Sequence, residues 1–215
     1  MIELIDGTLT IESRPIFTDI SLRLEPGVMT ALVGPSGSGK TSLLHCLGRI
    51  QDVSAGRILI GGEDASQWGS GRRRRFWRDQ AAFIHQDYGI VPDGTVAYNV
   101  SLAGGIFPRR HRAPSARETA ALADVGLADR GADKVVQLSG GERQRVGIAR
   151  ALYKGAAYIF ADEPTASLDE DNADRVIALL LASRSAGAAV VVATHDARLA
   201  SRCDQRISLM GGPHQ

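Results

Sequence analysis

Cysteine is scarce in this chain, and its two cysteines, Cys46 and Cys203, stand far apart in the sequence. They form no metal-binding or redox spacing, which excludes a small disulfide-stapled scaffold and favours a reducing compartment. Residues 1–6 lack the basic start and apolar core of a secretory signal, so we expect none. These absences favour a protein of the cytosol.

Long apolar runs and net charge are also missing. No apolar run approaches the roughly 18 residues that a membrane-spanning helix needs. Lysine and arginine number 25 against 24 aspartates and glutamates, and the net charge of +1 provides no overall attraction to nucleic acid. The 215 residues, 44% of them hydrophobic, allow one domain with an inserted lobe. We therefore expect a chain that reaches a membrane only through a partner.

A glycine-rich segment at 34–41 has a recognisable spacing. It reads GPSGSGKT and fits G-x-x-x-x-G-K-[ST], in which backbone N–H groups face phosphates, the lysine (Lys40) reaches the β/γ oxygens and the threonine (Thr41) ligates Mg²⁺. An apolar run at 28–33 predicts a strand entering the loop, and 41–47 predicts a helix leaving it. These flanks disfavour the alternative, a chance glycine-rich turn. The predicted phosphate-binding residues are Gly34, Pro35, Ser36, Gly37, Ser38, Gly39, Lys40, Thr41 and Ser42.

A pair of carboxylates follows a second apolar run. Residues 156–161 have the length of a buried strand, so Asp162 and Glu163 stand at its carboxyl end, where open α/β sheets bind ligands. Phosphoryl transfer needs a held metal and an oriented attacking water. We expect Asp162 to hold Mg²⁺ and Glu163 to polarise the water as general base. The alternative is an ordinary solvated strand exit, which the upstream phosphate loop disfavours.

The stretch 138–145, LSGGERQR, begins a predicted helix. Ser139 and Glu142 form the S-x-x-E pattern of a capping box. Gly140 and Gly141 between them leave backbone N–H groups unshielded, so this helix start is also a candidate anion site. One chain would then hold two phosphate-binding helix starts.

These segments, in this order, resemble the nucleotide-binding subunit of ATP-binding cassette (ABC) transporters over nearly the whole chain. Gln86 resembles the glutamine of the family's Q-loop. Ser167, Leu168 and Asp169 resemble its D-loop, and His195 resembles its switch histidine. Five short motifs in the family's order make this a specific resemblance.

The resemblance implies an α/β fold: a P-loop NTPase core with a mixed, mainly parallel sheet, an antiparallel β edge subdomain and an inserted α-helical subdomain. A single ABC ATPase domain would span 1–215. Its core and β subdomain would occupy about 1–93 and 155–215, and the helical lobe with the signature motif would occupy about 94–154.

The resemblance also implies the chemistry of each motif. Two cassettes pair head to tail, and the signature of one binds the γ-phosphate of ATP held by the other. Carried over, the residues that act in trans are Ser139, Gly140, Gly141 and Glu142. The implied cofactors are ATP and Mg²⁺. The implied catalytic residues are Glu163, His195 and Gln86, and the implied metal ligands are Thr41, Gln86 and Asp162.

The implied partners are an integral membrane permease, seated near Gln86, and a second copy of the chain or a paralogous cassette. The protein would be cytoplasmic and peripheral on the inner face of the cell membrane, attached through the permease. Residues 162–165, DEPT, resemble the macrolide-export and lipoprotein-release branch of the family, which favours export or extrusion over uptake.

Two positions depart from the family's pattern. Many cassettes stack adenine on an aromatic residue at a position that aligns near Ile11, and no aromatic residue stands there. Phe17 is close in the sequence, but we expect its side chain in the core. We infer apolar contact with adenine instead. Tyr98 stands where relatives often have glutamate, which affects contact with the membrane partner rather than hydrolysis.

Two other functions remain as alternatives. The run at 72–75, RRRR, before two aromatic residues permits a nucleic-acid interpretation, although a solvated helix face is favoured and no nucleic-acid partner is expected. A soluble ABC ATPase acting on nucleic acid or the ribosome is therefore the main alternative. A module that binds ATP without turnover is disfavoured, because Lys40, Glu163 and His195 are all present.

Overall fold

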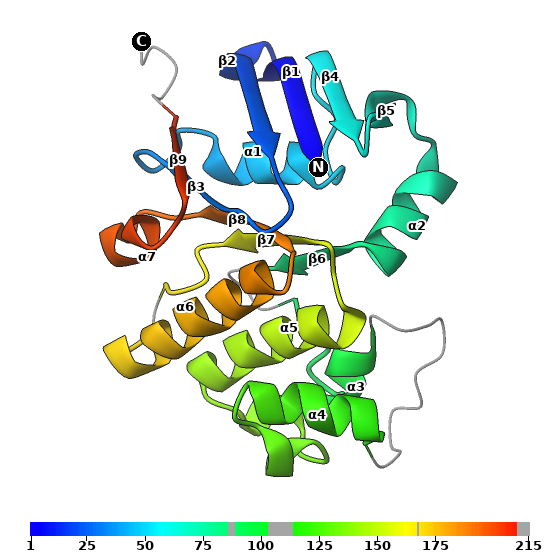
Figure 1. Ribbon diagram of the computed structural model, residues 1–215, viewed down its shortest axis with the longest axis vertical. Coiled ribbons are helices and arrows are strands. Elements are labelled where there is room, and N and C mark those ends of the chain that lie inside the picture. The colour runs from blue at the N-terminus through cyan, green and yellow to red at the C-terminus, as the bar shows by residue number, and fades with distance from the viewer. Residues whose placement is uncertain (86–88, 103–113, 167, 210–215) are drawn as a thin grey trace.

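The centre of the protein is a five-stranded parallel sheet with strand order β6-β7-β8-β3-β9 (Figure 1). The computed structural model describes residues 1–85, 89–102, 114–166 and 168–209. The strands of this sheet are β3 (Met29–Val33), β6 (Ala81–Ile84), β7 (Tyr158–Asp162), β8 (Ala189–Ala193) and β9 (Gln205–Ser208). Strands β3, β7 and β8 are buried over nearly their whole length, because other layers cover both faces of the sheet.

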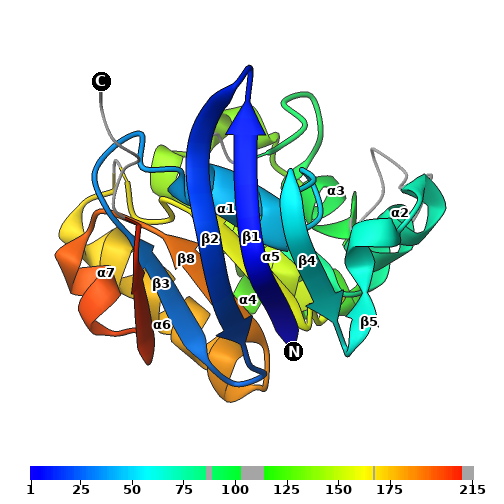
Figure 2. The same cartoon turned by 90° about the horizontal axis from the view of Figure 1, so that it is seen from above.

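An antiparallel sheet with strand order β2-β1-β4-β5 covers one side (Figure 2). Its strands are β1 (Ile2–Ile11), β2 (Arg14–Leu24), β4 (Ala55–Ile60) and β5 (Glu63–Asp64). Helix α1 (Lys40–Leu47) lies between the two sheets and shares a core with β1, which includes Leu4, Leu43 and Leu47. Phe17 is 6% exposed in this core, as predicted. Packing on both sides fixes α1 and therefore the loop before it.

Helices cover the opposite face of the parallel sheet (Figure 1). The two that pack on it are α5 (Gly140–Lys154) and α6 (Glu170–Ser185), whose buried side chains, such as Ile148 and Leu180, share a core with Val190 and Val192. The smaller elements beyond α5 are α3 (Val96–Ser101), α4 (Ala116–Asp124), η3 (Ala128–Arg130) and η4 (Val135–Gln137). The remaining elements are η1 (Ala65–Gln67), α2 (Ser70–Asp79) and α7 (Ala197–Ser201).

The predicted α/β fold with an antiparallel edge sheet is confirmed. In the described residues every pair of the central sheet is parallel, and antiparallel strand pairing belongs to the second sheet. Chain direction explains the division, since β1 and β2 join through a tight turn whereas β3, β7 and β8 are each followed by a helix. None of the described helices is long and apolar enough to cross a membrane.

Candidate functional site: a phosphate loop beside two carboxylates

The glycine-rich loop runs from the end of β3 to the start of α1. Gly39 caps the helix with φ 90°, a left-handed conformation that favours glycine. A Cβ added at Gly39 would lie 2.8 Å from Cγ2 of Ile16. Only a residue without a side chain fits here, so the loop curves tightly and its N–H groups stay open toward an anion. A cradle of this kind fits the phosphates of ATP.

Lys40 ties the start of the glycine-rich loop to the start of α1. Its Nζ donates hydrogen bonds to the carbonyl oxygens of Gly34, at 2.8 Å, and Pro35, at 3.0 Å. The side chain is largely buried, with 8% of the residue exposed. The hydroxyl of Ser38 is buried too and has no partner among the described residues. The ammonium group of Lys40 therefore lies directly against the backbone of the loop.

Thr41 and Asp162 meet across the site from different elements. The Thr41 hydroxyl, in the first turn of α1, donates to Oδ1 of Asp162 at the end of β7, at 3.1 Å. Burial raises the pKa of Asp162, the neighbouring Glu163 carboxylate raises it further, and the Thr41 hydrogen bond offsets part of this. A hydroxyl and a carboxylate side by side are oxygen ligands of the kind that Mg²⁺ takes. These residues therefore fit the predicted metal.

Glu163 and His195 also lie together, because their strands are neighbours in the parallel sheet. Strands β7 and β8 pair in parallel with Asp162 opposite Ala193, so the residues that follow leave the sheet at the same edge. Oε1 of Glu163 lies 2.9 Å from Nδ1 of His195. Glu163 is 16% exposed at its side chain and His195 is 72% exposed. The glutamate is thus shielded while the histidine faces outward.

Three hydroxyl and carboxylate side chains behind this pair were not foreseen from the sequence. The fully buried Thr194 donates from Oγ1 to Oε2 of Glu163 at 3.3 Å and accepts from the backbone N–H of Asp196 at 3.0 Å. Asp196 accepts from the Thr165 hydroxyl at 2.9 Å. Burial alone would raise the pKa of Asp196, but hydrogen bonds from Thr165 and from the first turn of α7 hold it below its usual value. The feature that could have identified Thr194 as a site residue is its position directly after β8, a strand of five buried residues.

The second helix start has the predicted capping box. The Ser139 hydroxyl accepts from the N–H of Glu142 at 3.3 Å, and the Glu142 carboxylate accepts from the N–H of Ser139 at 2.8 Å. That backbone hydrogen bond is the main cause of the lowered pKa of Glu142, and Arg130, 2.8 Å away, adds to it. Ser139 and Gly140 are exposed, so this helix end is open to an incoming anion.

The signature helix and the D-loop segment contact each other. Asp169 caps α6 by accepting from the N–H of Asn172 at 2.8 Å, and the Asn172 amide donates to Asp169 at 2.7 Å. Nη1 of Arg145, on α5, donates to the side-chain oxygen Oδ1 of Asn172 at 2.5 Å. A Cβ at Gly141 would lie 3.2 Å from Cγ of Asn172. Asn172 and Arg145 are further residues that sequence reasoning missed.

The structure therefore brings the predicted residues into two groups. The phosphate loop, Asp162, Glu163 and His195 gather at the carboxyl ends of β3, β7 and β8, which are neighbours in the sheet. The signature residues and Asp169 gather at the starts of α5 and α6. No hydrogen bond or ion pair of the described residues joins the two groups. Leu168 is half-buried, and Gln86 and Ser167 lie outside the described residues.

The two positions that depart from the family pattern are placed as follows. Ile11, at the end of β1, is 41% exposed, an unusual exposure for a large apolar residue in this fold. The apolar contact with adenine that we infer near this position stays a prediction. Tyr98 lies on α3, where its backbone N–H donates to the hydroxyl of the capping Thr95 at 3.1 Å.

Known sequences and structures agree with this geometry. Residues 17–166 match the ABC transporter family. The chain is 37% identical over 208 residues to the lipoprotein-releasing system ATP-binding protein LolD of Shewanella oneidensis, covering 96% of this chain and 89% of that protein. It is 38% identical over 201 residues to the macrolide export ATP-binding/permease protein MacB of Vibrio parahaemolyticus, covering 94% of this chain and 31% of that protein.

Among solved structures, the chain is similar to the dimeric ATP-binding cassette MJ0796 in a post-hydrolysis state bound to ADP and Pi. The TM-score is 0.88 with 30% identity, covering 99% of this chain and 95% of that one. A second dimeric structure of MJ0796, described as a bacterial ABC transporter cassette, gives a TM-score of 0.87 at 30% identity, covering 97% and 94%. The chain therefore belongs to the ABC transporter family and is one of its ATP-binding, ATP-hydrolysing cassettes.

Proposed function

We propose that this cassette hydrolyses ATP at composite sites between two copies and thereby drives a separate membrane permease. The observation that carries the proposal is the meeting of Thr41 with Asp162 and of Glu163 with His195 at one edge of the sheet. Both pairs lie beside the phosphate loop, where phosphoryl transfer needs them.

The phosphate loop and Lys40 would bind the β and γ oxygens of ATP. Lys40 would exchange its two carbonyl partners for phosphate oxygens, a stronger charge-assisted interaction. Thr41 and Asp162, with Gln86 from the Q-loop, would hold Mg²⁺. Mg²⁺ held there would supply positive charge that offsets the phosphate charge, and Asp162, whose pKa burial raises, would bind it in the ionised form.

Glu163 would take a proton from the attacking water. Its carboxylate is held by the Thr194 hydroxyl and by the ring of His195, so it has few other orientations. His195 is the more exposed member of the pair and would contact the γ-phosphate. Orientation by two neighbours is the arrangement that a general base requires.

The signature residues would act in trans. Their helix start is exposed and lacks an anion partner within the described chain, which is consistent with a site completed by a second cassette. The solved relatives with this fold are dimeric. We infer that Ser139, Gly140, Gly141 and Glu142 of one copy contact the ATP of the other. Ser167, Leu168 and Asp169 would lie between the two sites.

The partner would be a permease, because the curated relatives are ATP-binding proteins of a lipoprotein-releasing system and an ATP-binding/permease protein for macrolide export. Both names favour export or extrusion over uptake. The cassette would work in the cytoplasm, peripheral on the inner face of the cell membrane, with about 94–154 as the helical lobe and the remainder as the nucleotide core and β subdomain.

The test is a pull-down of the tagged Glu163→Gln variant from detergent-solubilised native membranes with ATP and Mg²⁺, followed by mass spectrometry. Co-purification of a polytopic membrane protein is the expected result. Nucleic acid or ribosomal proteins in its place would overturn the proposal in favour of the soluble alternative. ATPase activity stimulated by DNA or RNA, with a steep salt dependence, would point the same way.

A further inference from the structure

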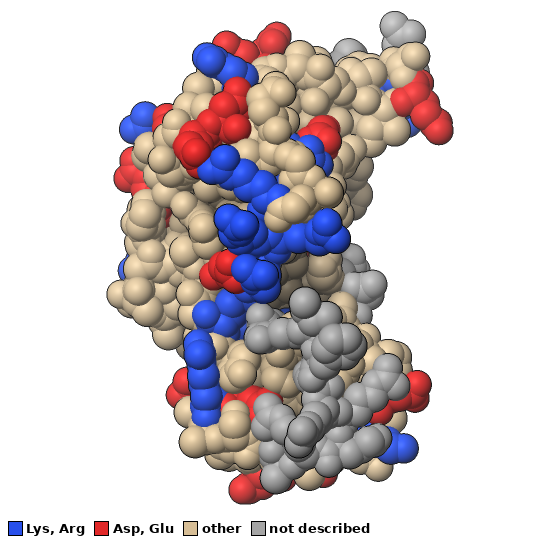
Figure 3. All heavy atoms as spheres, turned by 90° about the vertical axis from the view of Figure 1, so that its right-hand side faces the viewer, with Lys and Arg blue, Asp and Glu red and all other residues tan. Residues whose placement is uncertain are grey.

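Helix α2 carries more positive charge than the structure neutralises. Figure 3 faces this side of the molecule and shows basic side chains gathered across it. Arg72 pairs with Glu63, and Arg73 pairs with Asp52 at 2.6 Å. The helix also carries two exposed arginines that form no ion pair with any described residue, Arg74 and Arg75. The run at 72–75 therefore lies on a helix with a solvated face, as predicted, and Arg74 and Arg75 are available to pair with acidic groups of a partner.

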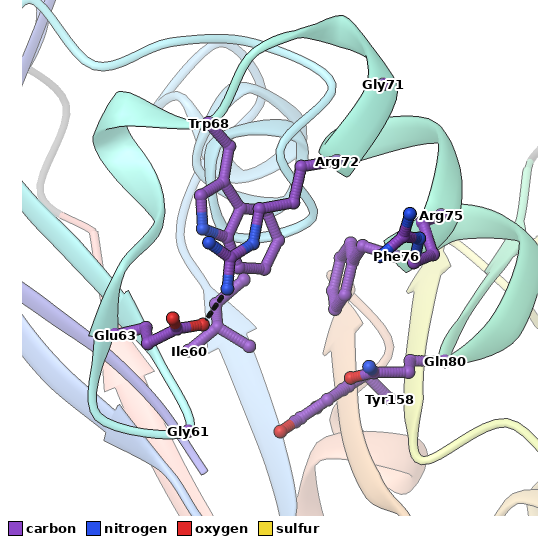
Figure 4. A pocket seen from close by; sticks show the side chains of 10 residues that line it. All are labelled: Ile60, Gly61, Glu63, Trp68, Gly71, Arg72, Arg75, Phe76, Gln80 and Tyr158. Atoms are coloured by element: carbon purple, nitrogen blue, oxygen red, sulfur yellow. Dashed lines mark hydrogen bonds and ion pairs between the residues drawn. The ribbon is translucent and has the colours of Figure 1, made fainter.

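A cavity of about 840 Å³ lies beside these arginines (Figure 4). Trp68, Phe76 and Tyr158 form an aromatic floor, with ring centroids 5.6 Å apart for the first pair and 5.7 Å apart for the second. The Arg72 guanidinium lies 4.9 Å from the centroid of Trp68, and Arg75 lines the opposite part of the cavity. We name this cavity the α2 pocket.

The α2 pocket is separate from the ATP site. Tyr158 is the first residue of β7 and Gln80 directly precedes β6, so the pocket lies at the amino ends of these strands. The phosphate loop and Glu163 lie at the carboxyl ends of the sheet. An occupant of the pocket would therefore leave the nucleotide free to bind and turn over.

The chemistry of the pocket favours a protein occupant. Tryptophan, tyrosine, phenylalanine and arginine are the residues enriched at the centres of protein interfaces. A flat bilayer surface would not reach an aromatic floor inside a concave cavity, whereas a protruding side chain would. The Nε1–H of Trp68 is buried without an acceptor among the described residues, which an occupant's oxygen would relieve. Arg75, which forms no ion pair with any described residue, favours an acidic occupant.

We propose that the α2 pocket seats an acidic segment of the membrane permease, with an apolar side chain on the aromatic floor and an Asp or Glu beside it on Arg75. The inference rests on the proposed function, which supplies the permease. The contact would hold the cassette at the amino ends of β6 and β7, away from the nucleotide.

Gly71 makes the proposal testable by cross-linking. It lines the pocket, and a Cβ added there would meet no atom within 4 Å, so we expect position 71 to accept a benzophenone amino acid. The tagged Glu163→Gln chain carrying this substitution is irradiated in native membranes and purified. The expected adduct joins the permease at a segment where Asp or Glu adjoins an apolar residue. The control carries the same amino acid in place of the exposed Arg202, beside β9 at the opposite edge of the central sheet from β6, and should give none.

Charge variants provide the second part of the cross-linking test. Arg75→Glu should lower the adduct yield about tenfold or more, whereas Arg75→Lys should retain it and Arg57→Glu, at an exposed residue on β4, should not change it. The ATPase rate of the isolated cassette should be the same in all of them.

The outcomes separate this inference from the proposed function. If the permease co-purifies but the adducts form only with lipid, with a second copy of the cassette or with nothing, the α2 pocket is not its seat and the proposed function stands. If no membrane protein co-purifies at all, both proposals fail together.

Discussion

At the scale of single residues, Glu163 has a strained backbone at the centre of the site. Its φ is 47°, a left-handed value that costs a residue with a side chain of order 1 kcal/mol. The hydrogen bond from its N–H to the carbonyl oxygen of Ala193, at 2.9 Å, and those to its side chain hold it there. In this backbone conformation the carboxylate lies against His195.

Replacing Glu163 by Gln should slow hydrolysis about 100-fold or more while ATP still binds, because the amide keeps the shape and loses the basic oxygen. Single-turnover ATP hydrolysis and equilibrium ATP binding measure the two effects. Gel filtration should show an ATP-dependent dimer. A variant that turns over ATP at the wild-type rate would sink the general-base assignment.

Thr194 should matter to turnover although it lies behind the site. Thr194→Val keeps the shape and removes the hydroxyl that donates to Glu163 and accepts from Asp196, so kcat should fall about tenfold with KM for ATP unchanged. Thr194→Ser restores the hydroxyl and should restore kcat. Equal losses in the two variants would show a packing effect instead of an orienting hydrogen bond.

At the scale of elements, two helix starts combine stability with function. Helix α5 begins with the capping box of Ser139 and Glu142 and ends at Gly155, whose φ of 65° closes the helix in a left-handed conformation. Helix α7 begins at Asp196, which accepts hydrogen bonds from the N–H groups of Arg198 and Leu199. Ser139 and Glu142 are also among the proposed in-trans residues, and Asp196 directly follows His195.

Ser139→Arg should leave ATP binding nearly intact and block dimer closure, because a long cation would fill the exposed helix start at which we propose that the partner's γ-phosphate binds. ATP binding is measured on the monomer, and dimer formation in the Glu163→Gln background. Arg143→Ala is a matched control on the same turn. Normal hydrolysis by Ser139→Arg would contradict the in-trans site.

Asp196→Ala should lower the free energy of unfolding at neutral pH by about 1 kcal/mol, the usual value of a helix cap. The folded-state pKa of Asp196 is below its unfolded value of about 3.9, so its stabilisation is present above that pH and is lost as the pH falls through the folded value. Urea unfolding at pH 7 and pH 3 measures this. The gap between wild type and variant should shrink at pH 3, and an unchanged gap would refute the role of the charge.

At the scale of the whole molecule, ATP binding should stabilise the fold through Lys40. Nucleotide at 100 times its dissociation constant contributes about 2.7 kcal/mol, which raises Tm by roughly 5–10 °C for a chain of this size. Lys40→Ala should abolish this shift, whereas Lys134→Ala, at an exposed site, should keep it. A thermal melt with and without ATP and Mg²⁺ is the measurement. A retained shift in Lys40→Ala would contradict the placement of the phosphates.

Much of the fold and of the candidate site followed from local patterns. Glycine spacing, the S-x-x-E box and an apolar strand before two carboxylates are each specified within ten residues, so the loop, the helix cap and Asp162 were predictable. Thr194 and Asn172 were not, because their roles depend on partners 31 and 27 positions away, Glu163 and Arg145. A single hydroxyl or amide side chain forms no recognisable sequence pattern, because its hydrogen-bond partner is known only once the chain has folded.

The sequence by itself determined which chemistry this chain carries: a phosphate loop, a carboxylate pair and a second helix start open to anions, all encoded by backbone freedom and short spacing. Only the tertiary structure decided how they combine. Parallel pairing of β7 with β8 places Glu163 beside His195, and the contact of α5 with α6 joins Arg145 to Asn172. Tertiary packing also forms the α2 pocket, because it brings together Trp68 and Tyr158, which are distant in the sequence. The reason is that strand order and helix packing depend on the whole core, which no short segment contains.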